Sequence, residues 1–226
     1  MKKRSLQCLA VYSLQKVPFL VFTFAFCLFT FLGCAKREIR NIGSQGKNII
    51  CFGDSMTFGV GANPGEDYPL VLSRMTNMPV INAGVDGDIS TEALRRIESD
   101  VLAREPLLVV IEFGGNDFLR RIPLEVTTNN IKAMVEKIQA KGAMVAIVDI
   151  SVGLIMGEYH EPLYNLAKEK DTIFIPKIFS GIFTNPRLQS DFVHPNADGY
   201  KIIAQRVYRV ITPHLNKNSL ARKFEK

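Results

Sequence analysis

The sequence alternates between short, continuous apolar runs and longer segments in which apolar positions recur every three to four residues. The apolar runs predict five strands, over residues 47–52, 80–82, 107–113, 144–150 and 172–175. The periodic segments predict five helices, over residues 68–78, 90–105, 127–141, 158–170 and 195–215, the second capped by Ser90. Strands without polar alternation, separated by helices, are typical of a parallel sheet covered on both faces. We therefore expect an α/β fold.

Four polar patches follow predicted strands or precede the last predicted helix. They are Gly53-Asp54-Ser55-Met56-Thr57, Asn82-Ala83-Gly84, Gly114-Gly115-Asn116-Asp117 and Asp191-Phe192-Val193-His194-Pro195. The carboxyl ends of parallel strands meet at one edge of the sheet, which is where such folds bind their ligands. We therefore expect these four patches to form one site.

The residue types in the patches are those that acyl transfer requires. The Ser55 hydroxyl is a weak nucleophile until a base takes its proton, and His194 is the base suited to neutral pH. A histidine base needs a carboxylate to fix its tautomer, and Asp191 stands three residues before it. These three residues are the predicted catalytic group.

The negative oxygen that develops during acyl transfer needs preorganised hydrogen-bond donors. The predicted donors are the backbone N–H groups of Ser55 and Gly84 and the side-chain amide of Asn116. Asp54 and Asp117 are expected to brace the loops that carry Ser55 and Asn116. Each patch alone is a common turn or cap, so the prediction depends on all four occurring in order at successive strand ends.

The motifs of neighbouring α/β folds are absent from the sequence. Thr57 occupies the place where a Gly-x-Ser-x-Gly nucleophile elbow has its second glycine. The sequence contains no Gly-x-x-x-x-Gly-Lys-Ser/Thr phosphate loop. Gly59-Val60-Gly61 lacks the third glycine of a dinucleotide fingerprint.

Together the four patches resemble the four sequence blocks of the SGNH, or GDSL-type, hydrolase family, from about Lys47 to near His214. Further matches point to its thioesterase/lysophospholipase/arylesterase branch: Gly59-Val60-Gly61, Tyr68-Pro69, Asp86-Gly87-Asp88 and the run from His194 to Tyr200. Met56 departs from the pattern, in which leucine is commoner. The resemblance implies a flavodoxin-like three-layer α/β/α sandwich with a five-stranded parallel sheet in the order 2-1-3-4-5. It also implies Ser55 as nucleophile, His194 as base, Asp191 as its partner, and the oxyanion donors named above.

The implied function is a serine hydrolase that cleaves carboxylic ester or thioester bonds through an acyl-Ser55 intermediate and needs no cofactor. The substrate stays open between a lysophospholipid, a short acyl ester and an acetylated sugar. Phe118, Leu119, Leu154, Ile155 and Met156 are candidates for an apolar acyl groove, although ordinary packing explains them nearly as well. The alternative is a surface lipoprotein that uses the same fold for binding without catalysis, which an activity-based probe distinguishes.

The N-terminal segment has the layout of an export signal. Lys2-Lys3-Arg4 is a basic leader, and 19 uncharged residues lie between Lys16 and Lys36. Leu32-Gly33-Cys34-Ala35 resembles the end of a bacterial lipoprotein signal, which predicts lipidation of Cys34. An uncleaved membrane anchor is the alternative, because 19 residues nearly span a bilayer. Both interpretations place the protein outside the cytoplasmic membrane, held to it or released into the periplasm. The chain then divides into a signal or anchor (1–34), a tether (35–46), a hydrolase domain (47–215) and a basic tail (216–226).

The charge distribution argues against a nucleic-acid partner. The chain of 226 residues has a net charge of +6, but residues 47–215 contain 17 basic and 20 acidic side chains, a net charge of −3. A nucleic-acid-binding domain needs its positive charge on the folded body. The expected partners are instead a small acyl ester or lysolipid and, through the N-terminus, a membrane.

The remaining polar candidates have plain structural interpretations. Three scattered histidines and one cysteine in the body, Cys51, provide no metal site. His160 is expected at the surface without a carboxylate partner beyond Glu158 and Glu161. The arginine pairs Arg95-Arg96 and Arg120-Arg121 are expected on solvated faces.

Overall fold

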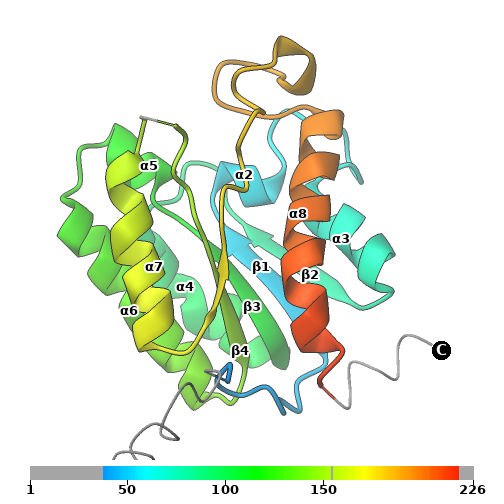
Figure 1. The fold of residues 1–226 in the computed structure, drawn as a ribbon, viewed down its shortest axis with the longest axis vertical. Helices are drawn as coiled ribbons and strands as arrows, with labels where there is room; N and C mark the ends of the chain where they lie inside the picture. Colours follow the sequence, from blue (N-terminus) through cyan, green and yellow to red (C-terminus); the bar gives the residue numbers. More distant parts are fainter. Residues whose placement is uncertain (1–37, 154, 219–226) are drawn as a thin grey trace, which may run out of the picture. The chain divides into compact units, whose positions relative to one another are not determined.

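The computed structural model describes residues 38–153 and 155–218, which belong to one compact unit that begins at Glu38. Five parallel strands form its sheet in the order β2-β1-β3-β4-β5 (Figure 1). The strands are β1 (Asn48–Gly53), β2 (Val80–Gly84), β3 (Pro106–Glu112), β4 (Met144–Val148) and β5 (Ile173–Ile175). The predicted parallel sheet and its order are confirmed.

The strand order determines which helices share a face. The connection from β1 to β2 runs across the sheet in the opposite direction to the later ones, so the right-handed crossover rule places its helix on the opposite face. Accordingly α3 (Tyr68–Thr76) packs against α8 (Ala197–Leu215). Helix α6 (Leu124–Ala140) packs against both α4 (Ser90–Asp100) and α7 (His160–Glu169). The result is the predicted three-layer α/β/α sandwich.

Two helix starts follow the expected capping chemistry, and one does not. Asp67 accepts a hydrogen bond from the Leu70 N–H at the start of α3, and Asn196 accepts one from the Gly199 N–H at the start of α8. Ser90 is not the cap of α4, since it already has helical geometry and its hydroxyl contacts Asp117 instead. Helix α4 also ends at Asp100, and a 3-10 turn, η1 (Leu102–Arg104), leads to β3.

Residues 38–46 lie along the amino edge of the sheet, the edge at which the strands begin. The Asn41 amide donates to the backbone oxygens of Gln139 and Ala143 over 2.9 and 3.0 Å. The Asn218 amide, just past α8, donates to the oxygens of Ile42 and Ser44, both over 2.9 Å. The predicted tether is therefore wrong for residues 38–46, because these bonds attach them to the domain.

The predictions for residues 1–34, including lipidation of Cys34, fall outside the described residues, as does the tail beyond Asn218. Within residues 38–153 and 155–218, none of the helices is long and apolar enough to cross a membrane.

Candidate active site

Ser55 begins the short helix α2 (Ser55–Phe58), which follows β1 after a single residue. That residue, Asp54, caps the helix by accepting a hydrogen bond from the Met56 N–H over 3.0 Å. The Ser55 side chain lies at the carboxyl edge of the sheet and is largely buried. The sharp turn from strand to helix thus presents the hydroxyl at the edge where parallel sheets bind ligands.

His194 and Asp191 come from the loop before α8 and reach the same edge. His194 Nε2 lies 3.1 Å from Ser55 Oγ, although 139 residues separate them. His194 Nδ1 lies 2.9 Å from Asp191 Oδ2. Asp191 Oδ1 also accepts the backbone N–H groups of Val193 and His194, which fixes the carboxylate in this orientation. The contact with His194 lowers the pKa of Asp191 below its ordinary value, so the carboxylate stays ionised.

This arrangement can activate a hydroxyl. With its proton on Nδ1, the imidazole donates to Asp191 and leaves Nε2 free to accept the Ser55 proton. The three predicted catalytic side chains are therefore brought together with the spacing that nucleophilic catalysis requires.

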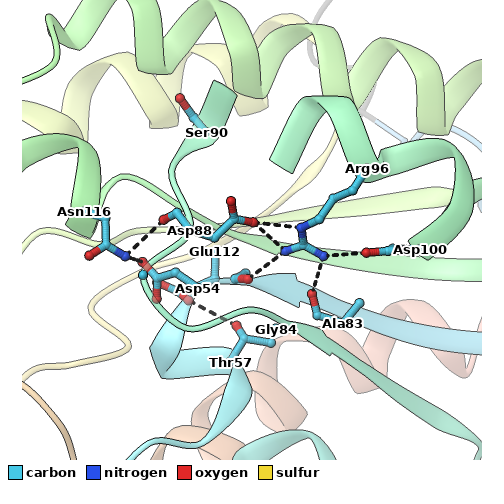
Figure 2. Close-up of polar contacts among 12 residues, drawn as sticks. Asp54, Thr57, Ala83, Gly84, Asp88, Ser90, Arg96, Asp100, Glu112 and Asn116 are labelled. Carbon is cyan, nitrogen blue, oxygen red and sulfur yellow. Dashed lines mark hydrogen bonds and ion pairs between the residues drawn. The ribbon is translucent and has the colours of Figure 1, made fainter. Parts of the chain in front are cut away.

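Asn116 belongs to the short helix α5 (Gly115–Leu119), which follows β3 after two residues. Its amide nitrogen lies 3.0 Å from the Asp88 backbone oxygen and 3.2 Å from Asp54 Oδ2 (Figure 2). Asp54 therefore holds both the nucleophile helix and the predicted oxyanion donor. Among the described residues, the Ser55 N–H has no acceptor, so it is available to a ligand.

Gly84 does not fit the predicted donor role. Its N–H donates to Asn82 Oδ1 over 2.9 Å, within its own strand. A Cβ at this position would lie 2.1 Å from the Phe58 backbone nitrogen, so glycine is required here for packing under α2. The prediction of Gly84 as an oxyanion donor is corrected on these grounds.

Gly87 is the glycine of this loop whose N–H is available. It is the third residue of a turn closed by the Asp88 N–H donating to the Val85 oxygen over 3.2 Å, and its φ is 74°. A glycine with positive φ at that position is the mark of a type II turn. Among the described residues its N–H has no acceptor, and the next residue holds the Asn116 amide. The sequence signal was Asp86-Gly87-Asp88, which contributed only to the family resemblance.

The second predicted bracing aspartate, Asp117, anchors the short helix that carries Asn116. It is fully buried and accepts from the Ser90 N–H and the Thr127 hydroxyl, both over 2.9 Å. It therefore ties α5 to the start of α4 and to α6. Asn116 itself is held by Asp54 and by the Asp88 oxygen.

Glu112 is a buried acid that sequence analysis did not assign. It ends β3, accepts the Thr57 hydroxyl over 3.0 Å and is hydrogen-bonded to Asp54. Burial and the neighbouring Asp54 raise the pKa of Glu112 well above its ordinary value. Burial raises the pKa of Asp54 to about 6. At neutral pH we therefore expect Glu112 to be protonated and to donate to an ionised Asp54.

An apolar cavity of about 390 Å³ opens beside Ser55 and His194. Four of the five predicted groove residues line it: Phe118, Leu119, Ile155 and Met156, while Leu154 is outside the described residues. Further lining comes from residues that were not predicted as groove residues: Ile150, Val152, Phe179, Phe183, Phe192 and Val193. The cavity is suited to a hydrocarbon chain next to the nucleophile.

The prediction for Arg96 was wrong in its surface placement, whereas His160, whose side chain is 39% exposed, was wrongly expected to have no carboxylate partner outside its own segment. Arg96 is partly buried, with a side chain only 17% exposed, and makes several polar contacts (Figure 2). His160 pairs with Asp149, which follows β4, over 2.8 Å between Nδ1 and Oδ2. Within residues 38–153 and 155–218, no group of three or more histidine, cysteine, aspartate or glutamate side chains could hold a metal ion.

Comparison with known proteins matches residues 51–202 to the GDSL-like Lipase/Acylhydrolase family. A thioesterase 1/protease 1/lysophospholipase L1 of Escherichia coli is 26% identical over 179 residues, which cover 76% of this chain and 86% of that protein. The esterase EstA of a Pseudoalteromonas species, solved with a monoethylphosphonate inhibitor, superposes with a TM-score of 0.68 at 27% identity, covering 75% of this chain and 99% of EstA. An uncharacterized lipoprotein of Bacillus subtilis is 26% identical over 164 residues, covering 66% of this chain and 64% of that protein.

Proposed function

Since the chain belongs to the GDSL-like lipase/acylhydrolase family and is a serine hydrolase of ester bonds, we propose that it cleaves carboxylic esters or thioesters through an acyl-Ser55 intermediate. The observation that carries the proposal is the continuous set of contacts from Ser55 Oγ through His194 to Asp191, at 3.1 and 2.9 Å. These contacts supply a nucleophile, a base and an orienting carboxylate.

In the acylation step, Ser55 Oγ attacks the carbonyl carbon while His194 Nε2 takes the hydroxyl proton. Asp191 stabilises the resulting imidazolium through its contact with Nδ1. Collapse of the tetrahedral intermediate transfers the Nε2 proton to the leaving alcohol or thiol and leaves the acyl group on Ser55. A water molecule then repeats the sequence, and the carboxylic acid product departs.

The developing oxyanion requires donors that are already in place. We assign this role to the N–H groups of Ser55 and Gly87 and to the Asn116 amide. The two backbone groups are without acceptors among the described residues. Asn116 offers a hydrogen by giving up its longer contact, the 3.2 Å one to Asp54, and keeps the 3.0 Å bond to the Asp88 oxygen.

The apolar cavity favours substrates with an acyl chain over acetylated sugars. Each buried methylene is worth about 0.8 kcal/mol, which corresponds to a roughly fourfold gain in kcat/KM. Across p-nitrophenyl esters from acetate upward, we expect kcat/KM to rise with acyl length until the chain outgrows the cavity. Preference for acetate throughout would favour the sugar-deacetylase alternative.

Ser55→Ala tests the catalytic assignment. We expect loss of p-nitrophenyl butyrate turnover and of fluorophosphonate labelling, because both require the Ser55 oxygen. Ser99→Ala, at an exposed serine on α4, is the matched control and is expected to keep both. Labelling that persists in Ser55→Ala would overturn the assignment.

We also propose that the protein is exported and held at the cell envelope through a lipid on Cys34. The basic leader, the apolar run and the sequence around Cys34 support this, as does the similarity to a lipoprotein of Bacillus subtilis. Globomycin treatment is expected to accumulate the precursor. An unchanged band would favour the uncleaved anchor.

A further inference from the structure

The Arg96 guanidinium donates four hydrogen bonds and makes a second ion-pair contact with Asp88, all within the protein. Nη1 donates to the Ala83 oxygen and to Asp100 Oδ2, both over 2.9 Å. Nη2 donates to the Gly53 oxygen over 3.1 Å, and Nε and Nη2 both reach Asp88 Oδ2, over 2.8 and 2.7 Å. Figure 2 shows the guanidinium at the centre of these partners.

Three of these partners belong to the segments that carry the proposed oxyanion donors. The Gly53 oxygen ends β1, two residues before Ser55. The Ala83 oxygen lies at the end of β2, from which the turn containing Gly87 departs. Asp88 directly follows Gly87, and its backbone oxygen holds the Asn116 amide. One guanidinium therefore bonds directly to the segments of Ser55 and Gly87, and it reaches Asn116 through Asp88, whose backbone oxygen holds the Asn116 amide.

We propose that Arg96 is a positioning residue for the oxyanion hole, holding the segments of Ser55, Gly87 and Asn116 at fixed distances from one another. The inference rests on the function proposed above. Oxyanion donors act only when they are preorganised, and a displacement of about 1 Å in a catalytic site costs roughly a hundredfold in rate. A side chain that holds two donor segments directly, and the third through Asp88, is expected to affect kcat.

The surroundings of Arg96 distinguish these contacts from a surface ion pair. The Asp88 side chain is 3% exposed, so its bond with Arg96 is shielded from water. The guanidinium carbon lies 4.4 Å from the centre of the Phe52 ring on β1, which fixes the plane of the group against the sheet. A lysine ammonium has neither the planar fork nor the spread of donors that this arrangement uses.

The test measures kcat and KM for Arg96→Lys and Arg96→Gln with a soluble p-nitrophenyl ester. We expect kcat to fall about 10- to 100-fold with KM within about threefold of wild type, because substrate binding in the cavity does not involve Arg96. The rate of inactivation by a p-nitrophenyl phosphonate is expected to fall in parallel, since that reaction also forms a tetrahedral adduct with an oxygen facing the donors.

Two controls on the same helix separate positioning from loss of stability. Arg95→Gln alters the exposed neighbouring arginine, and Ile97→Val destabilises the buried face of α4 without touching the polar contacts. Both are expected to keep the wild-type kcat, even where Ile97→Val lowers the melting temperature.

Asp88→Asn removes the negative charge from the other partner of the Arg96–Asp88 ion pair. It provides the test if neither Arg96 variant folds. It is expected to lower kcat while KM stays near wild type. In the double variant with Arg96→Lys, kcat is expected to fall little further than in the more impaired single variant, because both substitutions disrupt the same Arg96–Asp88 contact.

The outcomes separate this inference from the proposed function. Wild-type kcat in Arg96→Gln, or fully additive losses in the double variant, would overturn the positioning role while leaving Ser55 as nucleophile. A rise in KM that accounts for the whole loss would overturn it as well. Hydrolysis that survives in Ser55→Ala would instead overturn the proposed function.

Discussion

Replacing Glu112 with glutamine is expected to stabilise the protein progressively as the pH rises. Glu112 is 2% exposed, and burial together with the adjacent Asp54 raises the pKa of Glu112 well above its ordinary value of 4.5. Glutamine has nearly the same shape as protonated glutamate and can donate to Asp54 while accepting the Thr57 hydroxyl. The substitution thus keeps the hydrogen bonds and removes the ionisable group.

The magnitude follows from proton linkage. Below about pH 4.5 the glutamate is protonated in both the folded and the unfolded chain, so its ionisation does not affect stability. Above that pH the unfolded chain loses the proton while the folded protein keeps it. The wild type therefore loses about 1.4 kcal/mol of unfolding free energy per pH unit, until the folded pKa is reached. Over two such units the glutamine variant gains roughly 3 kcal/mol relative to wild type.

Urea unfolding followed by circular dichroism at pH 5, 6, 7 and 8 measures the difference between the two proteins. Because the glutamine can donate to Asp54 as the protonated glutamate does, we expect the titration of Asp54 to contribute similarly in both proteins. Glu125→Gln, at an exposed position in the first turn of α6, is the control and is expected to show a flat difference near zero. A difference between Glu112→Gln and wild type that stays flat or falls with pH would refute the reasoning.

Three further expectations follow from the geometry. Asp191→Asn should lower kcat by roughly 10⁴, because the carboxylate fixes the His194 tautomer; steady-state kinetics measure this. The melting temperature should change little in calorimetry, because the Asp191 side chain is half exposed. In urea unfolding, Gly84→Ala should destabilise the protein by at least about 2 kcal/mol, since the added Cβ would lie 2.1 Å from the backbone of α2. Gly157→Ala is the control and should be neutral, because its Cβ enters open space. Cys51 should not react with Ellman's reagent until urea unfolds the chain, because it is fully buried and burial raises the pKa of its thiol to about 12; rapid labelling of native protein would contradict this.

The sheet and the catalytic residues were predictable because their signals are local. A continuous apolar run such as Leu107–Ile111 has few alternatives to a buried strand, and the carboxyl ends of parallel strands necessarily meet. Ser55, Asn116 and His194 could therefore be assigned to one edge without knowing how the helices pack.

The errors arose where a choice between neighbours depends on tertiary structure. Arg95 and Arg96 differ by about 100° around α4, and the sequence does not reveal which one faces the sheet. Gly84 and Gly87 are three residues apart, and only the turn closed by the Val85 oxygen decides which amide remains free.

His160 illustrates a longer-range limit. Its partner Asp149 is eleven residues earlier, at the end of β4, and the two meet because the chain folds back between them. Neither residue carries a local signal of this pairing. The carboxylate that binds His160 is completely buried, which only the packed structure reveals.

The attachment of Asn41 and Asn218 to the amino edge places both described ends of the chain away from the catalytic side chains. The described chain begins and ends at that edge, while Ser55 lies at the opposite end of the strands, and β3 alone spans about 20 Å between them. The apolar cavity beside Ser55 therefore lies at the end of the domain that is remote from both described ends of the chain. A fusion partner or affinity tag joined at either described end should for the same reason leave hydrolysis intact.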